Sequence, residues 1–308
     1  MTSKRTLAAW AALATACVVA ACAQQQAAPP SNIQRLPEPP PAPPPPQQAA
    51  STVPQAQAAP APPPAPQAAP PSAPPTESQE RAREILMDMA RYLSGLPAFS
   101  VRVASNYDVV QPSGQKIEFG EARKLVVQRP NRMRADTERS DGARTSAAFS
   151  GSEIMLVDTA NKIYASTPQP GGLDESILYF VSDLKMRFPL AMLLLARLPV
   201  ELERRVRGVD YVETSYLSGV PSHHLAVRGD SVDFQVWVRA SDSPLPLRVV
   251  ITYKNEPGQP EFRANFADWN TRPGITATTF KLQPPQGAQK VVFAAQLVAM
   301  GTPGHQGK

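Results

Sequence analysis

The pattern of apolar and polar residues changes its period at Pro97, and this change divides the chain into a helical and a mostly extended part. Apolar residues recur at helical spacing from Ile85 to Leu96, and charged residues occupy the other side. This pattern predicts an amphipathic helix that Pro97 ends. Beyond Pro97 apolar and polar residues alternate, as they do in strands with one buried face.

Alternating segments continue as far as Phe266, separated by turn sequences rich in Gly, Ser, Asp and Pro. They predict about nine to eleven strands arranged as an antiparallel meander. The clearest segments are residues 99–109, 117–127, 133–136, 154–157, 162–165, 206–212, 223–227, 232–238, 247–253 and 262–266.

Leu173 to Leu198 interrupts the meander with helical character. Residues 173–181 suit an amphipathic helix, and residues 188–196 suit a second helix that is apolar nearly all round. A segment this short and this apolar is typical of a buried helix, because a bilayer span needs about 18 residues or more. The predicted fold class is α+β: a strongly curved antiparallel sheet, an incomplete β-barrel, covered by about three helices.

The first 22 residues resemble the signal peptide of a bacterial lipoprotein. Lys4 and Arg5 form a basic head, Leu7 to Ala20 form a short apolar stretch, and Val19-Ala20-Ala21 precedes Cys22. The resemblance implies removal of residues 1–21 and lipidation of Cys22. Alternatives are an ordinary secretory signal, a membrane anchor, or lipidation at Cys17, whose upstream residues fit less well.

In lipoproteins of this kind the cysteine carries a thioether-linked diacylglycerol and an N-acyl chain such as palmitate. Two or more chains give stable membrane anchoring where one does not. An Asp after the cysteine often favours inner-membrane retention, and this chain has Ala23. The resemblance therefore implies a location at the outer membrane, anchored on its periplasmic face.

Residues 22–76 join this cysteine to the rest of the chain and consist mainly of Pro, Ala, Gln and Ser. Such a composition cannot bury enough apolar surface to offset chain ordering, so we expect a disordered linker biased to polyproline II. At about 3.1 Å per residue its reach is on the order of 150 Å. A proline-rich ligand for another module is an alternative. We place one domain at 77–298 and a disordered tail at 299–308.

Composition and motifs narrow the functional classes. Both cysteines of the chain precede residue 23, so the domain has no disulfide or thiolate site. From Glu77 onward the chain carries 28 basic and 25 acidic residues, interspersed, which is no footprint for nucleic acid. His223 and His224 are neighbours on a predicted strand and so point to opposite faces, which disfavours a metal site. Without a recognisable catalytic motif, we expect a non-enzymatic protein that needs no cofactor.

Several motifs, taken in their order along the chain, carry a further resemblance. They are residues 129–134 (RPNRMR), 219–225 (GVPSHHL), 233–238 (DFQVWV), 244–248 (PLPLR) and 280–288 (FKLQPPQGA). Over residues 83–293 the chain resembles a family of predicted periplasmic proteins within the LolA/LolB-like lipoprotein-carrier superfamily. The resemblance implies a half-barrel whose concave apolar face is covered by helices and binds lipid acyl chains.

On this basis we predict a cavity, its cover and its ligand. The lining candidates are Val101, Val103, Phe119, Val127, Met133, Leu225, Phe234, Val236, Val249 and Ile251. The lid candidates are Leu86, Met89, Leu93, Met192, Leu194 and Leu195. The expected ligand is a lipid or lipoprotein, bound by a monomer. The alternatives are an adaptor for an envelope protein, with the cavity closed by its own helices, and a hydrolase using His223 or His224.

Overall fold

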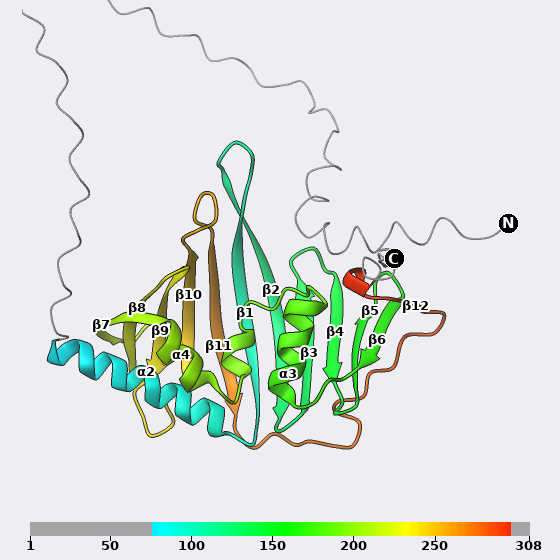
Figure 1. Ribbon diagram of the computed structural model, residues 1–308, viewed down its shortest axis with the longest axis horizontal. Coiled ribbons are helices and arrows are strands. Elements are labelled where there is room, and N and C mark those ends of the chain that lie inside the picture. Colours follow the sequence, from blue (N-terminus) through cyan, green and yellow to red (C-terminus); the bar gives the residue numbers. More distant parts are fainter. Residues whose placement is uncertain (1–75, 297–308) are drawn as a thin grey trace, which may run out of the picture. The chain divides into compact units, whose positions relative to one another are not determined.

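The computed structural model describes residues 76–296, which form one open twelve-stranded sheet with three α-helices, two short helical turns and a last helical stretch that starts at residue 294 (Figure 1). The predicted signal peptide, Cys22, the linker to residue 75 and the tail lie outside the described residues. The strands are β1 (Ala98–Val110), β2 (Lys116–Gln128), β3 (Arg132–Arg139), β4 (Arg144–Phe149), β5 (Glu153–Asp158), β6 (Ile163–Pro168), β7 (Val206–Ser215), β8 (Ser222–Gly229), β9 (Val232–Arg239), β10 (Pro246–Tyr253), β11 (Glu261–Asn270) and β12 (Gln289–Val291). The helical elements are α2 (Glu77–Gly95), α3 (Leu173–Leu178), the π-helical turn η1 (Tyr179–Asp183), the 3₁₀ turn η2 (Ala191–Leu194) and α4 (Leu198–Arg205).

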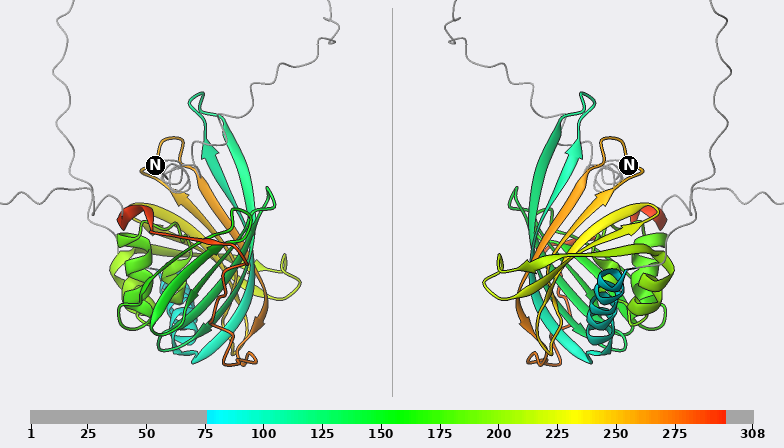
Figure 2. Two further views of the ribbon diagram at one scale, coloured as in Figure 1. Left: turned by 90° about the vertical axis from the view of Figure 1, so that its right-hand side faces the viewer. Right: turned by 90° about the vertical axis from the view of Figure 1, so that its left-hand side faces the viewer.

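The sheet follows the chain order as a meander on each side of β1. Its strand order is β12-β6-β5-β4-β3-β2-β1-β11-β10-β9-β8-β7. Neighbouring strands pair antiparallel except β12, which pairs parallel to β6. β7 and β12 do not pair with each other, so the sheet stays open, and it curves around the helices that lie in its hollow (Figure 2).

The helix α2 begins as its sequence favours. Thr76 is the N-cap, and its hydroxyl accepts a hydrogen bond from the Gln79 backbone N–H while the Gln79 side chain accepts one from the Thr76 backbone N–H. This reciprocal capping box satisfies two donors that a helix start leaves unpaired. The predicted helix is confirmed, and Glu77 and Glu80 are the acidic residues of its first turn.

Two strands and one helix differ from the sequence-based expectation. The weakly patterned β4 was not among the predicted segments, and neither was the three-residue β12. The helix predicted over 188–196 is wrong, because Phe188 is in coil, Pro189 and Leu190 form a turn, and only η2 is helical, with 3₁₀ geometry. The regular helix there is α4, which starts at Leu198 with Pro199 in its first turn, where proline is tolerated.

A single apolar core lies between the concave face of the sheet and the helices. It joins alternate residues of β1, β2, β3 and β8–β11 to α2 and to the segment from Leu173 to Leu202. Phe280 lies outside this core and is also buried, in the coil after β11, where the Thr279 carbonyl accepts a hydrogen bond from Arg134 Nη1 at 3.3 Å. The first residue of the 280–288 motif is therefore a packing residue.

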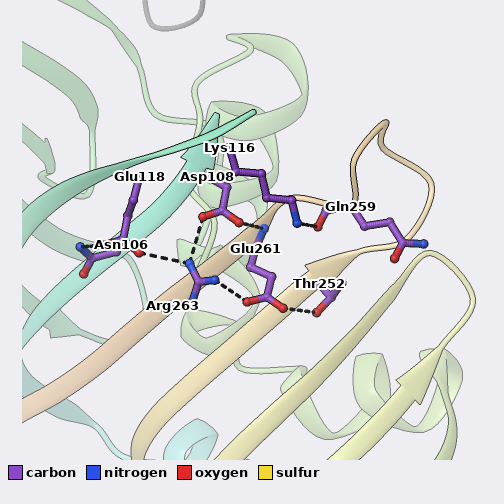
Figure 3. Close-up of polar contacts among 8 residues, drawn as sticks. All are labelled: Asn106, Asp108, Lys116, Glu118, Thr252, Gln259, Glu261 and Arg263. Atoms are coloured by element: carbon purple, nitrogen blue, oxygen red, sulfur yellow. Dashed lines mark hydrogen bonds and ion pairs between the residues drawn. The ribbon is translucent and has the colours of Figure 1, made fainter. Parts of the chain in front are cut away.

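The hairpins β1–β2 and β10–β11 are tied together by charges (Figure 3). Arg263 Nη1 lies 3.0 Å from Asp108 and 3.3 Å from Glu118, and its Nη2 lies 2.6 Å from Glu261. Burial alone would raise the pKa of Asp108, but the Glu261 backbone N–H and Arg263 hold that pKa below its ordinary value. The network therefore favours a charged Asp108 at neutral pH.

Candidate functional site

The ten predicted lining residues come together on the concave face or along its upper part. Seven are buried in the core, namely Val101, Val103, Val127, Met133, Leu225, Val236 and Val249. Phe234 and Ile251 are half-buried and pack against the same core. Phe119 is half-buried outside it and stacks on Tyr107 at 6.0 Å between ring centroids. Strand alternation places these residues on one face, which is why the sequence pattern found them.

The α2 lid candidates pack directly into this face. Leu86, Met89 and Leu93 are each 1–2% exposed and belong to the core. Side-chain hydrogen bonds hold the helix at its sides: Gln79 Nε2 donates to Asp210 at 2.7 Å, and Tyr92 Oη donates to Ser243 Oγ at 3.0 Å. The helix therefore closes one half of the hollow.

The segment from Tyr179 to Leu195, which we call the insertion lid, closes the other half. Leu194 and Leu195 are buried and Met192 is half-buried. Phe180 packs edge-on against Phe149 of β4 with 5.5 Å between ring centroids. The insertion lid contains only the single turns η1 and η2, joined by coil. Its attachment to the sheet is therefore carried mainly by apolar side chains.

A charged pair lies on this otherwise apolar face, and the sequence analysis did not identify it. Arg123 and Glu121 on β2 have side chains only 9% and 13% exposed, joined by a 2.7 Å bond from Nη2 to Oε1. Arg123 Nε also donates to Thr137 Oγ1 at 3.1 Å, and its guanidinium lies 5.1 Å from the ring centre of Phe188. The pair thus links the sheet to the insertion lid through a cation–π contact.

The alternation of β2 contained the signal that locates this pair. Leu125 and Val127 face the core, so residues 121 and 123, which lie four and two positions before Leu125, must face it too. Burial lowers the pKa of Arg123, while the neighbouring Glu121 charge acts in the opposite direction. An arginine keeps its charge through such a shift. The concave face therefore holds one internally compensated charge pair.

Hydrogen bonds fix the insertion lid at its two ends. Before it, Leu173 N donates to the Pro130 carbonyl at 2.7 Å, which joins the start of α3 to the β2–β3 turn. After it, the Asp174 carboxylate accepts hydrogen bonds from Ala196 N at 2.8 Å and Arg197 N at 3.3 Å. The two ends of the segment are thereby clamped to each other, while its middle relies on packing.

Glu201 on α4 forms a second charged anchor. Its buried carboxylate lies 3.4 Å from Arg197, 3.1 Å from Arg204 and 3.0 Å from Arg205. Burial acts to raise the pKa of Glu201, but the hydrogen bond from Arg205 and the three positive charges hold that pKa below its ordinary value. The carboxylate is thus ionised and fixes the helix that follows the lid.

The two histidines face opposite sides of β8, as their adjacency predicts. His223 Nδ1 lies 3.2 Å from Tyr211 Oη, and burial together with the charge of Arg81 lowers the pKa of His223. His224 instead stacks on Trp237, with 4.0 Å between ring centroids. Across residues 76–296 no cluster of three potential ligands is placed to hold a metal ion.

Two hollows open on the surface, and Val101 is the one predicted lining residue that borders either of them. One, of about 480 Å³, runs along α2 beside Tyr92, His223 and Arg239. The other, of about 460 Å³, lies beside Arg102 and Lys124 at the bulge in β1. Both contain charged side chains. An apolar chain would fit the concave face, where the helices now lie, better than either hollow.

Comparison with solved structures finds folds of similar extent at low identity. A conserved protein from Thermus thermophilus matches with 13% identity and a TM-score of 0.40, covering 69% of this chain and 99% of that one. Mycobacterium tuberculosis lipoprotein LppX matches with 11% identity and a TM-score of 0.40, covering 65% and 100%. A putative outer membrane lipoprotein-sorting protein domain from Vibrio parahaemolyticus matches with 10% identity and a TM-score of 0.31, covering 66% and 97%. No curated protein matches the chain.

A family model decides the classification. The family described as "Predicted periplasmic protein (DUF2092)" matches residues 82–294, which span α2, the sheet and the insertion lid. Within residues 76–296 no helix has the length and apolar character needed to cross a bilayer. The resemblance to a family of predicted periplasmic proteins, inferred from the sequence motifs, is confirmed. The chain belongs to the family of predicted periplasmic proteins DUF2092.

Proposed function

We propose that this protein is a non-enzymatic envelope lipoprotein that binds the acyl chains of lipids or lipoproteins on its concave face. The observation that carries the proposal is the cover of that face. Many of the lid side chains that contact it are buried and apolar, yet the insertion lid has little regular secondary structure. Removing apolar area from water stabilises such a contact by about 25 cal/mol per Å², whether the area belongs to a lid or to a ligand.

An acyl chain replaces the lid side chains at little net cost under this proposal. Leu190, Leu194 and Leu195 offer aliphatic surface of the same chemistry as a lipid tail. The clamps at Asp174 and Glu201 hold the ends of the segment while its middle lifts. The lipid anchor at Cys22 and the outer-membrane location are further parts of the proposal, and they rest on the first 23 residues.

Native mass spectrometry of the full chain, purified from membranes in mild detergent, tests the proposal. We expect adducts with the masses of phospholipid or fatty acid, in addition to the covalent anchor. A fluorescent fatty acid should also enter the purified protein. An apo mass together with no uptake of the probe would contradict acyl-chain binding.

A lid variant makes the uptake test specific. Asp174→Ala removes the clamp on Ala196 and Arg197, so we expect uptake to become severalfold faster. Asp141→Ala is the matched control, because Asp141 accepts a backbone hydrogen bond from Ala143 at 3.0 Å in the distant β3–β4 turn. Equal rates in the two variants would show that the insertion lid does not gate the site.

A second function is favoured by how completely the face is filled. Leu86 and Leu93 are each 1% exposed, so the domain is well packed without a ligand. An adaptor would bind an envelope protein on its outer surface. This function requires only a well-packed domain and no ligand on the concave face. Crosslinking in cells that traps protein partners, combined with an apo mass, would select this function over acyl-chain binding.

A further inference from the structure

The hairpin between β7 and β8 carries exposed apolar side chains at its tip. Tyr216 is 68% exposed, Leu217 is 84% exposed and Val220 is 39% exposed, and these three residues form what we call the apolar tip. Val212, half-exposed on β7, extends it. Four of the eight large hydrophobic side chains exposed within residues 76–296 thus lie in one nine-residue stretch. Scattered single residues would need no explanation, but a cluster does.

The hairpin holds these side chains outward. Gly219 N donates to the Tyr216 carbonyl at 3.0 Å and closes a turn, for which Gly219 takes a φ of +74°. At the base, the buried Ser222 hydroxyl donates to the Ser215 carbonyl at 3.0 Å, and Ala240 N donates to the Pro221 carbonyl at 2.9 Å. The exposure of the apolar tip is therefore part of a defined structure.

The chemistry of the apolar tip fits a lipid surface. From Ser215 to Ser222 the sequence is Ser-Tyr-Leu-Ser-Gly-Val-Pro-Ser, without a charged residue, in a chain that is 19% charged. Tyrosine is suited to the membrane interface because one end of its side chain is apolar and the other is polar. A turn with small polar neighbours can insert into the membrane interface, because a lipid surface is fluid and does not require a complementary binding pocket.

We propose that the apolar tip inserts into the interface of the membrane to which the chain is tethered. The inference rests on the proposed lipid anchor at Cys22. Residues 23–75 separate that cysteine from α2 and allow a separation on the order of 150 Å at most. Tethering makes the second contact intramolecular, so a weak apolar contact is enough to hold the domain against the surface.

Insertion would also fix which end of the domain faces the membrane. His223, three residues after Val220, lines the 480 Å³ hollow beside α2. Because Ile85 and Tyr92 of α2 line the same hollow, the contact would also bring this edge of α2 toward the lipid. Asp242 and Arg239 both line this hollow, and Arg81 and Glu213 lie beside Tyr211 and His224, so the charges offset each other and we expect binding that depends little on salt or on anionic lipid.

Site-specific fluorescence on the full chain tests the inference. Leu217→Cys is labelled with the environment-sensitive dye NBD and mixed with phosphatidylethanolamine and phosphatidylglycerol vesicles. We expect a blue shift and a severalfold rise in emission. Val200→Cys, on α4 and 61% exposed, is the matched control and should not change. The parent chain, labelled in parallel, corrects for any dye attached at a position other than 217.

A second measurement separates the apolar tip from the anchor. In a Cys22→Ala chain, Tyr216→Ser with Leu217→Asp should reduce co-sedimentation with the same vesicles at least about tenfold, because aspartate is costly to insert. Unchanged emission at residue 217, or a rise that follows protein concentration without vesicles, would overturn the inference. The first result would leave acyl-chain binding intact, since native mass spectrometry measures that separately.

Discussion

The concave face has two covers of different construction. The first cover, α2, is one 19-residue helix with a capping box and regular hydrogen bonding. The second cover, the insertion lid, lies between α3 and α4 and consists of two single turns joined by coil. Both bury leucine and aromatic side chains against the same sheet. Apolar burial alone therefore does not explain why one cover is regular and the other is not.

The two covers differ in the interactions that each must break in order to leave the sheet. The regular backbone of α2 moves as a unit, and leaving the sheet would break its bonds to Asp210 and Ser243 at once. The insertion lid can lift its middle while Asp174 and Glu201 keep its ends in place. Low local regularity is typical of elements that open separately from the rest of a fold. Under the proposed function, the insertion lid would therefore be the gate and α2 the support.

The largest effect should come from breaking the buried pair beneath the insertion lid. Arg123→Met leaves Glu121 without its charge partner inside the apolar face. Removing one member of a buried pair costs about 3–5 kcal/mol, so the free energy of unfolding should fall by that amount in urea denaturation. The contact with Phe188 is lost as well, so exchange of lid amides should accelerate.

The double variant Arg123→Met with Glu121→Leu is the control for this prediction. It removes both charges and should recover most of the lost stability, because a well-packed apolar pair often replaces a buried ion pair at little cost. A double variant as unstable as Arg123→Met would mean that the arginine acts through packing, with the charge contributing little.

The next effect compares one leucine from each cover. Leu93→Ala in α2 should lower the free energy of unfolding by about 3 kcal/mol, because a rigid helix leaves a cavity. Leu194→Ala, equally buried, should cost about 2 kcal/mol or less, because an irregular segment can collapse onto the gap. Its main effect should be on acyl-probe uptake, which we expect to rise. Equal losses of stability would remove the distinction between the covers.

Regular periodicity made one cover predictable from the sequence and the other only in part. The spacing of Leu86, Met89 and Leu93 marks one helical face, and the alternation from Val101 onward marks the strands. Residues 188–196 are apolar nearly all round, so their sequence has no periodicity that would distinguish a helix from turns. The conformation of this segment depends on the shape of the sheet surface against which it packs, and that shape cannot be predicted from the local sequence.

The charged pair was missed for a different reason. Core residues on β2 were predicted from their apolar side chains. Glu121 and Arg123 are charged, so they were not predicted to lie in the core. Side chains on a strand alternate between its two faces, so residues 121, 123 and 125 share one face. This rule would have placed both charged residues on the inner face with Leu125. The partners Thr137 and Phe188 come from β3 and the insertion lid, so only the fold shows that the charges are satisfied.

A smaller effect should follow from removing the cap of α2. Thr76→Ala deletes the hydroxyl that accepts from Gln79 N, and the loss of such a cap costs about 1 kcal/mol. Because α2 is the supporting cover, the thermal midpoint should fall while acyl-probe uptake stays unchanged. Ser94→Ala, near the end of the same helix, removes a hydroxyl that only returns to the Arg91 carbonyl and should change neither. Faster uptake in Thr76→Ala would give α2 a part in gating.

The smallest effect should be visible in acid, at the far anchor of the insertion lid. Because the pKa of Glu201 is lower in the folded chain than in the unfolded one, the carboxylate stabilises the fold above its unfolded pKa of about 4.3. That contribution is lost as the pH falls through the lower folded value. Glu201→Gln should therefore be less stable than the parent by about 1 kcal/mol or less at pH 7, with three exposed arginines as partners. The difference should shrink as the pH falls below the unfolded pKa and vanish once Glu201 is protonated in the folded chain as well; other carboxylates titrate there too, so only the difference between the chains is diagnostic. A gap that persists in acid would show that the shape of the side chain, and not its charge, fixes α4.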